Sequence, residues 1–466
     1  MEKKWTIFFI AHAVDSKLKH HLADLIYFLE KYRWDFENCN VLYLKNAYAD
    51  IPGPSRRRAI QAILYNIKDI HGDLDSHVEK NFGQINIGST INLIDIFSYV
   101  KRHFDADRFM VFTWDHGSGF GVWEADPTFR DLSFRLGIDK NLNDPALENL
   151  PMRYMITNNS LAEKMDILSN MKEISDDNFS TAWEKAEHTY ELLFQKEETD
   201  ILTNDELAKA IKEGFDGKKI DILIMVNCFM QMVETGFSLK DTVKYLVAAE
   251  TSFWAYGFNY LSIFDKIMED PEKVETRELV ELFITTVKKR YQRAGHENYL
   301  DDVVVSACDL SFVNPLADAI DEFVNLVEKN TSYHYPSIRS CRKQCTELSG
   351  LLWPGETPPD PYPIYIVDLT YFLFLMKETD QSIAELYNTI YNDIIFEKYV
   401  VKSEVGKLFQ KGGAIEEVNG ISIYFPETKK NTGKDYYKYF YKSRSKFEIE
   451  YAKQRLWSKF LPVYLK

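Results

Sequence analysis

The most informative stretch of this chain is an apolar run that stops abruptly at a polar residue and a cysteine. Six of the seven residues from Ile220 to Val226 are apolar, and Asn227 and Cys228 follow directly. The run has neither a helical period nor strict alternation, and it is shorter than most helices. Such a run is typical of a strand that is buried on both faces inside a parallel sheet. Because open α/β sheets bind ligands beyond the carboxyl ends of their strands, Cys228 is a candidate functional residue.

A second apolar run of the same kind lies upstream and ends at a histidine. Residues 108–114 are followed by Asp115 and His116, and then by three glycines in five residues, at positions 117, 119 and 121. Glycines at this density turn the backbone, because they accept a positive φ. If the two runs are neighbouring parallel strands, an imidazole and a thiol leave the same sheet edge. A nearby imidazole can take the proton of the thiol and so create a nucleophilic thiolate.

Each of these two residues also has an ordinary structural interpretation. Free cysteines are among the most buried residue types, so Cys228 could simply be a core residue. A histidine that precedes a glycine, as His116 does, often belongs to a turn or a cap. The residue patterns taken alone leave both alternatives open.

Composition limits the classes of protein and of partner. The chain has 466 residues, enough for two or more domains, and its apolar content of 45% supports large cores. A net charge of −15 argues against a nucleic acid or an anionic membrane as partner. Five cysteines are few for this length and odd in number, which argues against a disulfide framework. No pattern in the sequence indicates an oligomeric state.

Two possible metal sites have little support in the sequence. Cys341 and Cys345 are separated by three residues and have His334 nearby, but no second cysteine pair accompanies them, as most zinc sites require. Acidic residues in the loops show no spacing typical of a calcium cage, so calcium is possible without being indicated. We therefore expect no cofactor.

The sequence also bears on the cellular compartment. Neither a signal peptide nor an apolar stretch of membrane-spanning length is visible. A cytoplasmic protein is the default expectation, and a secreted or periplasmic one is the alternative if a leader has been removed.

The order of the remaining patterns predicts an α/β fold. Apolar strands alternate with amphipathic helices, which indicates a mainly parallel sheet sandwiched by helices, with a mostly helical C-terminal part. We expect a catalytic domain over residues 1–265 and a helical region over 266–466 that contributes a late strand at 421–425. Residues 125–200 form a long polar insertion, which predicts a lid or a processed linker. Among the local signals, a helix is expected at about 55–67, and a capping box is expected to start a helix after Thr203.

Several ordered segments resemble one family, the clostripain-like cysteine peptidases, which share a caspase-like fold. The resemblance runs from Trp5 to Pro426 and is weak at 125–200 and 330–360. Its main blocks are Gly88 through the following helix to Phe112–Gly119, Leu202 through Asp221–Leu223 to Cys228–Met230, Val247–Glu250, Gly257–Tyr260, Ser306–Leu310 and Gly420–Pro426. The order of these blocks is specific to the family, although no single block is.

The resemblance implies roles for individual residues. Cys228 matches the nucleophile of the family, and His116 matches its base partner. The backbone N–H of Gly117, together with that of Cys228, would stabilise the oxyanion of the tetrahedral intermediate. The residues that would contact a peptide or protein substrate are Ser118, Val226, Asn227, Thr251, Trp254 and Tyr256.

Three positions depart from the pattern of family members that cleave after Arg or Lys. Val226 stands where those members carry an aspartate, and Tyr256 replaces a second acidic position. Because an unpaired cation would be desolvated between Val and Tyr side chains, we expect no preference for a basic P1 residue and favour an apolar or aromatic one. Asn227 replaces a small residue and could change the oxyanion region or the pocket floor.

These observations favour a cysteine endopeptidase with a Cys228/His116 dyad. Two alternatives stay open. One is a caspase-fold binding or scaffold protein whose catalytic activity has decayed, and the other is an amide or thioester hydrolase that acts on a non-protein substrate.

Overall fold

A computed structural model of the chain describes residues 3–12, 19–48, 60–70, 73–83, 85, 87–122, 202–293, 303–348, 365–405, 420–427, 441 and 448–465. The insertion predicted at 125–200 lies outside these described residues. Within them, no helix combines the length and the apolar character that crossing a membrane requires.

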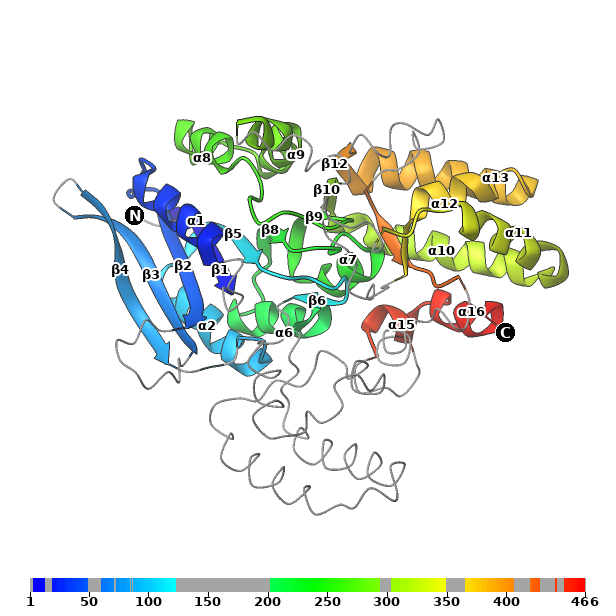
Figure 1. Cartoon of the computed structure of the whole chain (residues 1–466), viewed down its shortest axis with the longest axis horizontal. Helices are drawn as coiled ribbons and strands as arrows, with labels where there is room; N and C mark the ends of the chain where they lie inside the picture. The colour runs from blue at the N-terminus through cyan, green and yellow to red at the C-terminus, as the bar shows by residue number, and fades with distance from the viewer. Residues whose placement is uncertain are drawn as a thin grey trace, which may run out of the picture.

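A nine-stranded sheet runs through the described part of the chain (Figure 1). Its spatial order is β12-β10-β9-β8-β5-β1-β2-β3-β4. The strands are β1 (Lys3–His12), β2 (Cys39–Tyr48), β3 (Ile60–Ile70), β4 (Asp73–Gly83), β5 (Ala106–Trp114), β8 (Ile220–Val226), β9 (Val243–Ala249), β10 (Val304–Asp309) and β12 (Val400–Val405). The strands from β9 to β2 are parallel, and antiparallel strands flank them on both sides. The two apolar runs of the sequence, β5 and β8, are therefore adjacent parallel strands, as expected.

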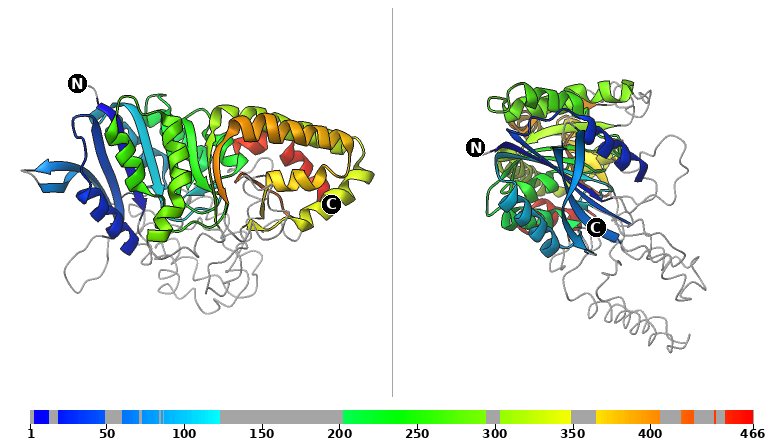
Figure 2. Two further views of the ribbon diagram at one scale, coloured as in Figure 1. Left: turned by 90° about the horizontal axis from the view of Figure 1, so that it is seen from above. Right: turned by 90° about the vertical axis from the view of Figure 1, so that its left-hand side faces the viewer.

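Helices cover both faces of this sheet (Figure 2). The helices are α1 (Lys19–Lys31), α2 (Thr90–His103), α6 (Asn204–Gly214), α7 (Val233–Leu239), α8 (Tyr260–Glu269), α9 (Thr276–Arg293), α10 (Val313–Glu328), α11 (Thr331–Gln344), α12 (Leu369–Met376), α13 (Gln381–Asn388), α15 (Glu450–Gln454) and α16 (Trp457–Tyr464), with a 3₁₀ turn at Leu310–Phe312 and a π-helix at Thr389–Tyr399. Along β1, Phe8 and Ile10 join the core beneath α2, α6 and α7, whereas Ile7 and Phe9 join the core beneath α1, α8 and α9. This alternation is what buries a strand on both faces. The predicted fold class is confirmed.

The C-terminal part adds both strands and helices. β10 and β12 extend the central sheet, and α10 to α13 lie beyond its edge together with α15 and α16 (Figure 1). The strand predicted at 421–425 is observed as β13 (Ser422–Tyr424), which pairs with β11 (Ile366–Asp368) in a separate two-stranded sheet. Another small sheet joins β6 (Gly121–Val122) to β7 (Leu202–Thr203). The predicted domain boundary at residue 265 stays a prediction.

The structure tests two local predictions, the helix at about 55–67 and the capping box after Thr203. The prediction of a helix at about 55–67 is wrong from residue 60 onward. There the chain forms β3, which pairs with β2 on one side and β4 on the other. Tyr65 of β3 stacks on Tyr43 of β2 with ring centroids 4.7 Å apart, a cross-strand contact that a helix would not make. The capping box after Thr203 is present at the start of α6, because Thr203 and Glu206 exchange hydrogen bonds between side chain and backbone.

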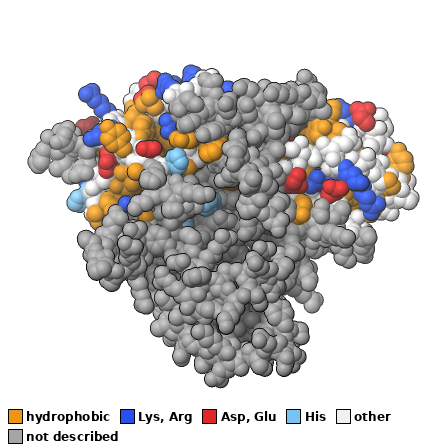
Figure 3. Space-filling view, viewed as in Figure 1, with side chains coloured by type: hydrophobic (Ala, Val, Ile, Leu, Met, Phe, Trp, Pro, Cys, Tyr) orange, Lys and Arg blue, Asp and Glu red, His pale blue; other side chains and the backbone are white. Residues whose placement is uncertain are grey.

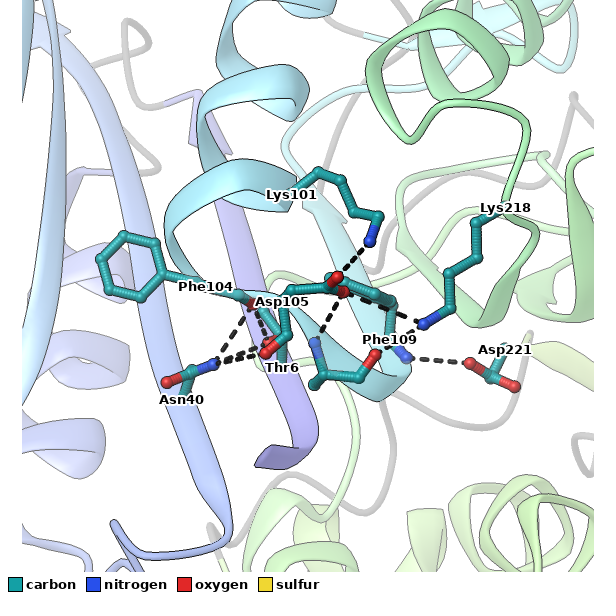
Figure 4. A network of polar contacts seen from close by, with 9 residues as sticks. Thr6, Asn40, Lys101, Phe104, Asp105, Phe109, Lys218 and Asp221 are labelled. Atoms are coloured by element: carbon teal, nitrogen blue, oxygen red, sulfur yellow. Dashed lines mark hydrogen bonds and ion pairs between the residues drawn. The ribbon is translucent and has the colours of Figure 1, made fainter. Parts of the chain in front are cut away.

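Hydrogen bonds tie the strands together at the amino end of the sheet (Figure 4). The Thr6 hydroxyl donates to the Phe104 carbonyl at 2.5 Å and accepts from the Asn40 amide at 3.0 Å. Further along the same end, the buried Asp221 accepts the N–H of Phe109 at 2.8 Å. These contacts join β1, β2, β5 and β8 at the end that lies opposite to Cys228.

The described surface is mixed in character. On the face shown in Figure 3, acidic, basic and apolar side chains are interspersed over the described residues, and neither sign of charge dominates there.

Candidate active site

The register of β5 and β8 brings the two predicted catalytic residues to one sheet edge. Trp114 is paired with Val226 in the last pair of the two strands, so the segments that begin at Asp115 and at Asn227 leave the sheet at the same edge. A backbone hydrogen bond from Asp115 N to the Val226 carbonyl (3.4 Å) extends the pairing by one residue. The predicted meeting of the two strand ends is thus confirmed at the level of the backbone.

Gly117 packs directly on the backbone of the nucleophile segment. A Cβ atom at this position would lie 2.5 Å from the carbonyl oxygen of Cys228, 3.0 Å from its nitrogen and 2.9 Å from the Cβ of Asn227. These distances are too short for any real side chain. The glycine therefore allows the histidine loop to touch the cysteine loop.

The sulfur of Cys228 lies against a backbone segment that follows β9. The Phe253 N–H donates to the sulfur at 3.3 Å, and the Phe253 carbonyl lies 3.7 Å from it. The next residue, Phe229, has a φ of +63°, which turns the chain sharply away from the strand. Its N–H is held by the Thr251 carbonyl at 3.0 Å.

Cys228 differs from the other four cysteines in its exposure. Cys228 is partly exposed, whereas Cys39, Cys308, Cys341 and Cys345 are buried. Burial raises the pKa of the Cys39, Cys308 and Cys345 thiols to about 12. Because a thiol must ionise to act as a strong nucleophile, these three are poor candidates for chemistry.

Asn227 lies beneath the site and is fully buried. Its side-chain oxygen accepts from the Thr113 hydroxyl at 2.6 Å, and its amide nitrogen donates to the carbonyls of Asp115 and His116, at 2.9 Å each. The side chain thus joins the two catalytic loops. It was predicted as a substrate contact, but its hydrogen bonds are all directed into the protein.

The other predicted substrate-binding residues fall into two groups. Ser118 and Thr251 are buried, and their hydroxyls bond to the backbone of Gly121 and to that of Ser252 and Val304, respectively. Trp254 and Tyr256 are partly exposed, next to the loop that holds the sulfur. Only the second group can offer side-chain surface to a ligand without rearrangement.

Val226 is buried at the end of its strand beneath Gly257. A Cβ at Gly257 would lie 3.3 Å from Val226 Cγ1 and 2.1 Å from the Tyr260 hydroxyl, so these residues form one tightly packed wall. The guanidinium of Arg290 stands 5.9 Å from the ring centroid of Tyr256, the residue before Gly257. A cation therefore already faces the ring of Tyr256.

Two residues of this site, Asp115 and His12, were not predicted from the sequence. Asp115 precedes His116, has a φ of +141°, and its carboxylate contacts both His12 and the N–H of His116. The position of Asp115 directly before His116 was visible in the sequence. The contact with His12 could not be read from the sequence, because it requires knowing that β1 lies beside β5.

The weak metal signals gain no support. Within the described ranges, no group of three or more His, Cys, Asp or Glu side chains is arranged to hold a metal ion. At the end of α11, the Cys345 thiol donates to the Cys341 carbonyl at 3.3 Å, as a buried thiol commonly does at a helix end.

A model of the clostripain family matches residues 177–464, which is more than half of the chain. The chain belongs to the clostripain family. The matched segment contains Cys228, whereas His116 lies upstream of it. The clostripain-like resemblance seen in the sequence is confirmed, and the protein is an enzyme of the cysteine peptidase class. No curated protein sequence matches the chain.

Solved structures of the same class share the fold. A secreted C11 cysteine protease from Bacteroides thetaiotaomicron, in complex with an irreversible peptide inhibitor, is 14% identical, with a TM-score of 0.56 over 98% of this chain and 99% of that chain. An inactive zymogen C11 protease from Parabacteroides distasonis is 15% identical, with a TM-score of 0.54 over 97% and 98% of the two chains. At identities of 14% and 15%, the similarity to these two solved structures shows a shared fold alone.

Proposed function

We propose that this clostripain-family enzyme hydrolyses peptide bonds through a dyad of Cys228 and His116. The observation that carries the proposal is the pairing of Trp114 with Val226, which sends the two residues out of the same sheet edge. The direct contact between Gly117 and the Cys228 backbone supports the same conclusion, because the two loops touch where the chemistry would occur.

Each group has a defined task in this mechanism. His116 accepts the thiol proton of Cys228, and the thiolate attacks the carbonyl carbon of the scissile peptide. The backbone N–H groups of Gly117 and Cys228 stabilise the oxyanion, and the imidazolium returns the proton to the leaving amine. Water then attacks the thioester with His116 as base, which releases the second product and restores the thiol.

The proposal includes a substrate preference for an apolar or aromatic P1 residue. Val226 and Tyr256 provide no carboxylate for a basic side chain, and Arg290 near the Tyr256 ring would repel one. The carboxylate of Asp115, which precedes His116 in the chain, is turned toward His12 and the His116 N–H.

The dyad is tested with a panel of fluorogenic peptides on the wild type, Cys228→Ala and His116→Ala. Each variant should lose about 10³-fold or more in kcat/KM, as removal of a nucleophile or its base does in other hydrolases. Cys308→Ala is the matched control, since Cys308 is a fully buried cysteine of β10 whose sulfur accepts from the Gln231 amide. Undiminished turnover by Cys228→Ala would remove the dyad assignment.

A peptide library that varies only P1 tests the preference. We expect the largest kcat/KM for apolar or aromatic P1 residues and the smallest for Lys and Arg. Val226→Asp should raise the relative rate for basic P1 residues. A wild-type enzyme that prefers Arg or Lys would refute this part of the proposal without affecting the dyad.

A further inference from the structure

We propose that His12 and Asp115 act as positioning residues that fix His116 for catalysis. The inference rests on the proposed dyad and adds two residues that act through His116. Its basis is that the ends of three adjacent strands, β1, β5 and β8, lie next to one another. β1 pairs with β5 in parallel, with Ala11 opposite Trp114, so that His12, the last residue of β1, lies beside Asp115.

The Asp115 carboxylate holds two partners at once. Its Oδ2 lies 2.5 Å from Nδ1 of His12, and its Oδ1 accepts the backbone N–H of His116 at 2.6 Å. An ionised carboxylate only accepts hydrogen bonds, so Nδ1 of His12 is the donor. The same Oδ1 lies 3.8 Å from Nε2 of His116. Both side chains of the pair are buried, with 9% exposed for His12 and 2% for Asp115.

The backbone of Asp115 is strained, and its neighbours hold it in place. Its φ of +141° is one that residues other than glycine rarely adopt. The Asn227 amide donates to its carbonyl at 2.9 Å, and its N–H reaches the Val226 carbonyl. Strained residues of this kind persist only where the surroundings over-determine them, and they cluster at functional sites.

A purely structural role does not account for an aspartate at this position. Glycine would adopt the observed φ without strain, and it would remove the need to bury a carboxylate. What the aspartate adds is contact with His12 on one side and with His116 on the other. The first contact holds the Asp115 carboxylate, and the second acts on the residue whose imidazole the proposed mechanism uses.

The expected consequence is a loss of rate rather than of binding. Without the donor from His12, the Asp115 carboxylate keeps only its contacts with His116, and the strained backbone can relax and carry His116 with it. A displacement of about 1 Å in a catalytic group costs about 10²-fold in rate. Substrate contacts near Trp254 and Tyr256 are unaffected, so KM should stay close to its wild-type value.

The test compares His12→Phe, which keeps a ring but loses the donor, with His12→Asn, whose amide nitrogen can take the place of Nδ1. Activity is expressed per active site, titrated with an irreversible thiol-reactive peptide. We expect kcat of His12→Phe to fall by about 10- to 100-fold with KM within about twofold, and His12→Asn to recover most of that loss. His334→Phe is the control, because His334 is equally buried, in α11, and makes none of the contacts of this site.

The outcomes separate this inference from the dyad itself. If His12→Phe keeps its kcat per titrated site within about twofold of the wild type, or if His12→Asn is as impaired as His12→Phe, the inference is wrong even when Cys228→Ala is inactive. If His12→Phe does not fold, His12→Ala replaces it, and added imidazole should restore kcat. A failure of imidazole to restore it would likewise overturn the inference. Undiminished activity of Cys228→Ala would instead refute the proposed function.

Discussion

Two ends of one sheet each bury an aspartate, and the two carboxylates are held in similar ways. At the amino end, Asp221 of β8 accepts the Phe109 N–H at 2.8 Å and pairs with Lys244 at 2.6 Å. At the carboxyl end, Asp115 has the same two kinds of partner, a backbone N–H and a nitrogen of a basic side chain. Both carboxylates are 2% exposed.

The two aspartates differ in backbone strain. Asp221 lies within a regular strand, whereas Asp115 has a positive φ. Among the described residues other than glycine, four have a positive φ, and two of these, Asp115 and Phe229, are the neighbours of His116 and Cys228 in the chain. One end of the sheet therefore uses a buried carboxylate to hold strands together. The other end uses one to hold a loop in an unfavourable conformation, which is typical of functional sites.

The largest expected effect comes from Gly117→Ala compared with Gly217→Ala. At Gly117 the added methyl group would meet the backbone of Cys228 at 2.5 Å, so the two loops must separate, and we expect activity to fall by about 10²-fold or more. At Gly217, near the amino end, φ is +77° and nothing lies within 4 Å. There we expect about 1 kcal/mol of destabilisation and unchanged kcat. Peptide turnover and denaturant unfolding of both variants measure the contrast. Equal activity in the two variants would contradict the expected difference between the two ends of the sheet.

The next comparison is Asp115→Asn with Asp221→Asn. The change at Asp115 weakens the contact with His12, and kcat should fall about 10- to 100-fold with little change in KM. The change at Asp221 leaves Lys244 without its ion pair and should lower the free energy of unfolding by about 1–3 kcal/mol with kcat within twofold. Kinetics per titrated site and urea unfolding distinguish the two effects. A catalytic defect of similar size in both variants would contradict the division of roles.

A third prediction concerns Glu234, a fully buried carboxyl of α7 that follows the nucleophile loop. Burial raises the pKa of Glu234 to about 7, although it accepts hydrogen bonds from the Tyr424 N–H and the Tyr441 hydroxyl. Because its pKa is higher in the folded state than in the unfolded state, this group's contribution to stability is fully present below about pH 4.5. That contribution is lost as the pH rises through about 7.

Glu234→Gln should therefore remove this part of the pH dependence. The free energy of unfolding of the wild type should fall by up to about 3 kcal/mol between pH 4.5 and pH 8 relative to that of the variant. Urea unfolding of both proteins at several pH values measures the difference. Parallel pH profiles would show that Glu234 does not titrate in this range.

The smallest expected effect is that of Thr6→Val at the amino end. The substitution removes the hydrogen bond to the Phe104 carbonyl, while the Asn40 amide still reaches that carbonyl at 3.2 Å. We expect a loss of about 1 kcal/mol in unfolding free energy and no change in peptide turnover. Thermal unfolding together with the fluorogenic assay tests this, and a loss of activity would show that the two ends are coupled.

The sequence correctly predicted those parts of the fold that depend on residues close together in the chain. The apolar run before Cys228 and the glycine turn after His116 identified two adjacent strand ends, and the capping box of Thr203 marked the start of α6. The failure at β3 has a nonlocal cause, because residues 60–67 contain good helix formers. Pairing on both sides with β2 and β4 overrides that propensity.

The residues that support His116 could not be recognised from the sequence for the same reason. The pairing of His12 with Asp115 depends on strand order, which no local pattern specifies. Asn227 was recognised as unusual, but its direction could not be known, since a polar residue at a strand end can face either a ligand or the protein. Its three hydrogen bonds within the site decide the direction.

The most direct test of the whole account is the rate at which iodoacetamide alkylates each cysteine at neutral pH, followed by peptide mapping. Cys228 should react first, because the other four cysteines are buried and burial raises the pKa of their thiols. His116→Ala should slow the alkylation of Cys228 by about tenfold or more. If Cys228 reacts no faster than the buried cysteines, or equally fast without the His116 imidazole, the thiol is not activated and the catalytic account is wrong.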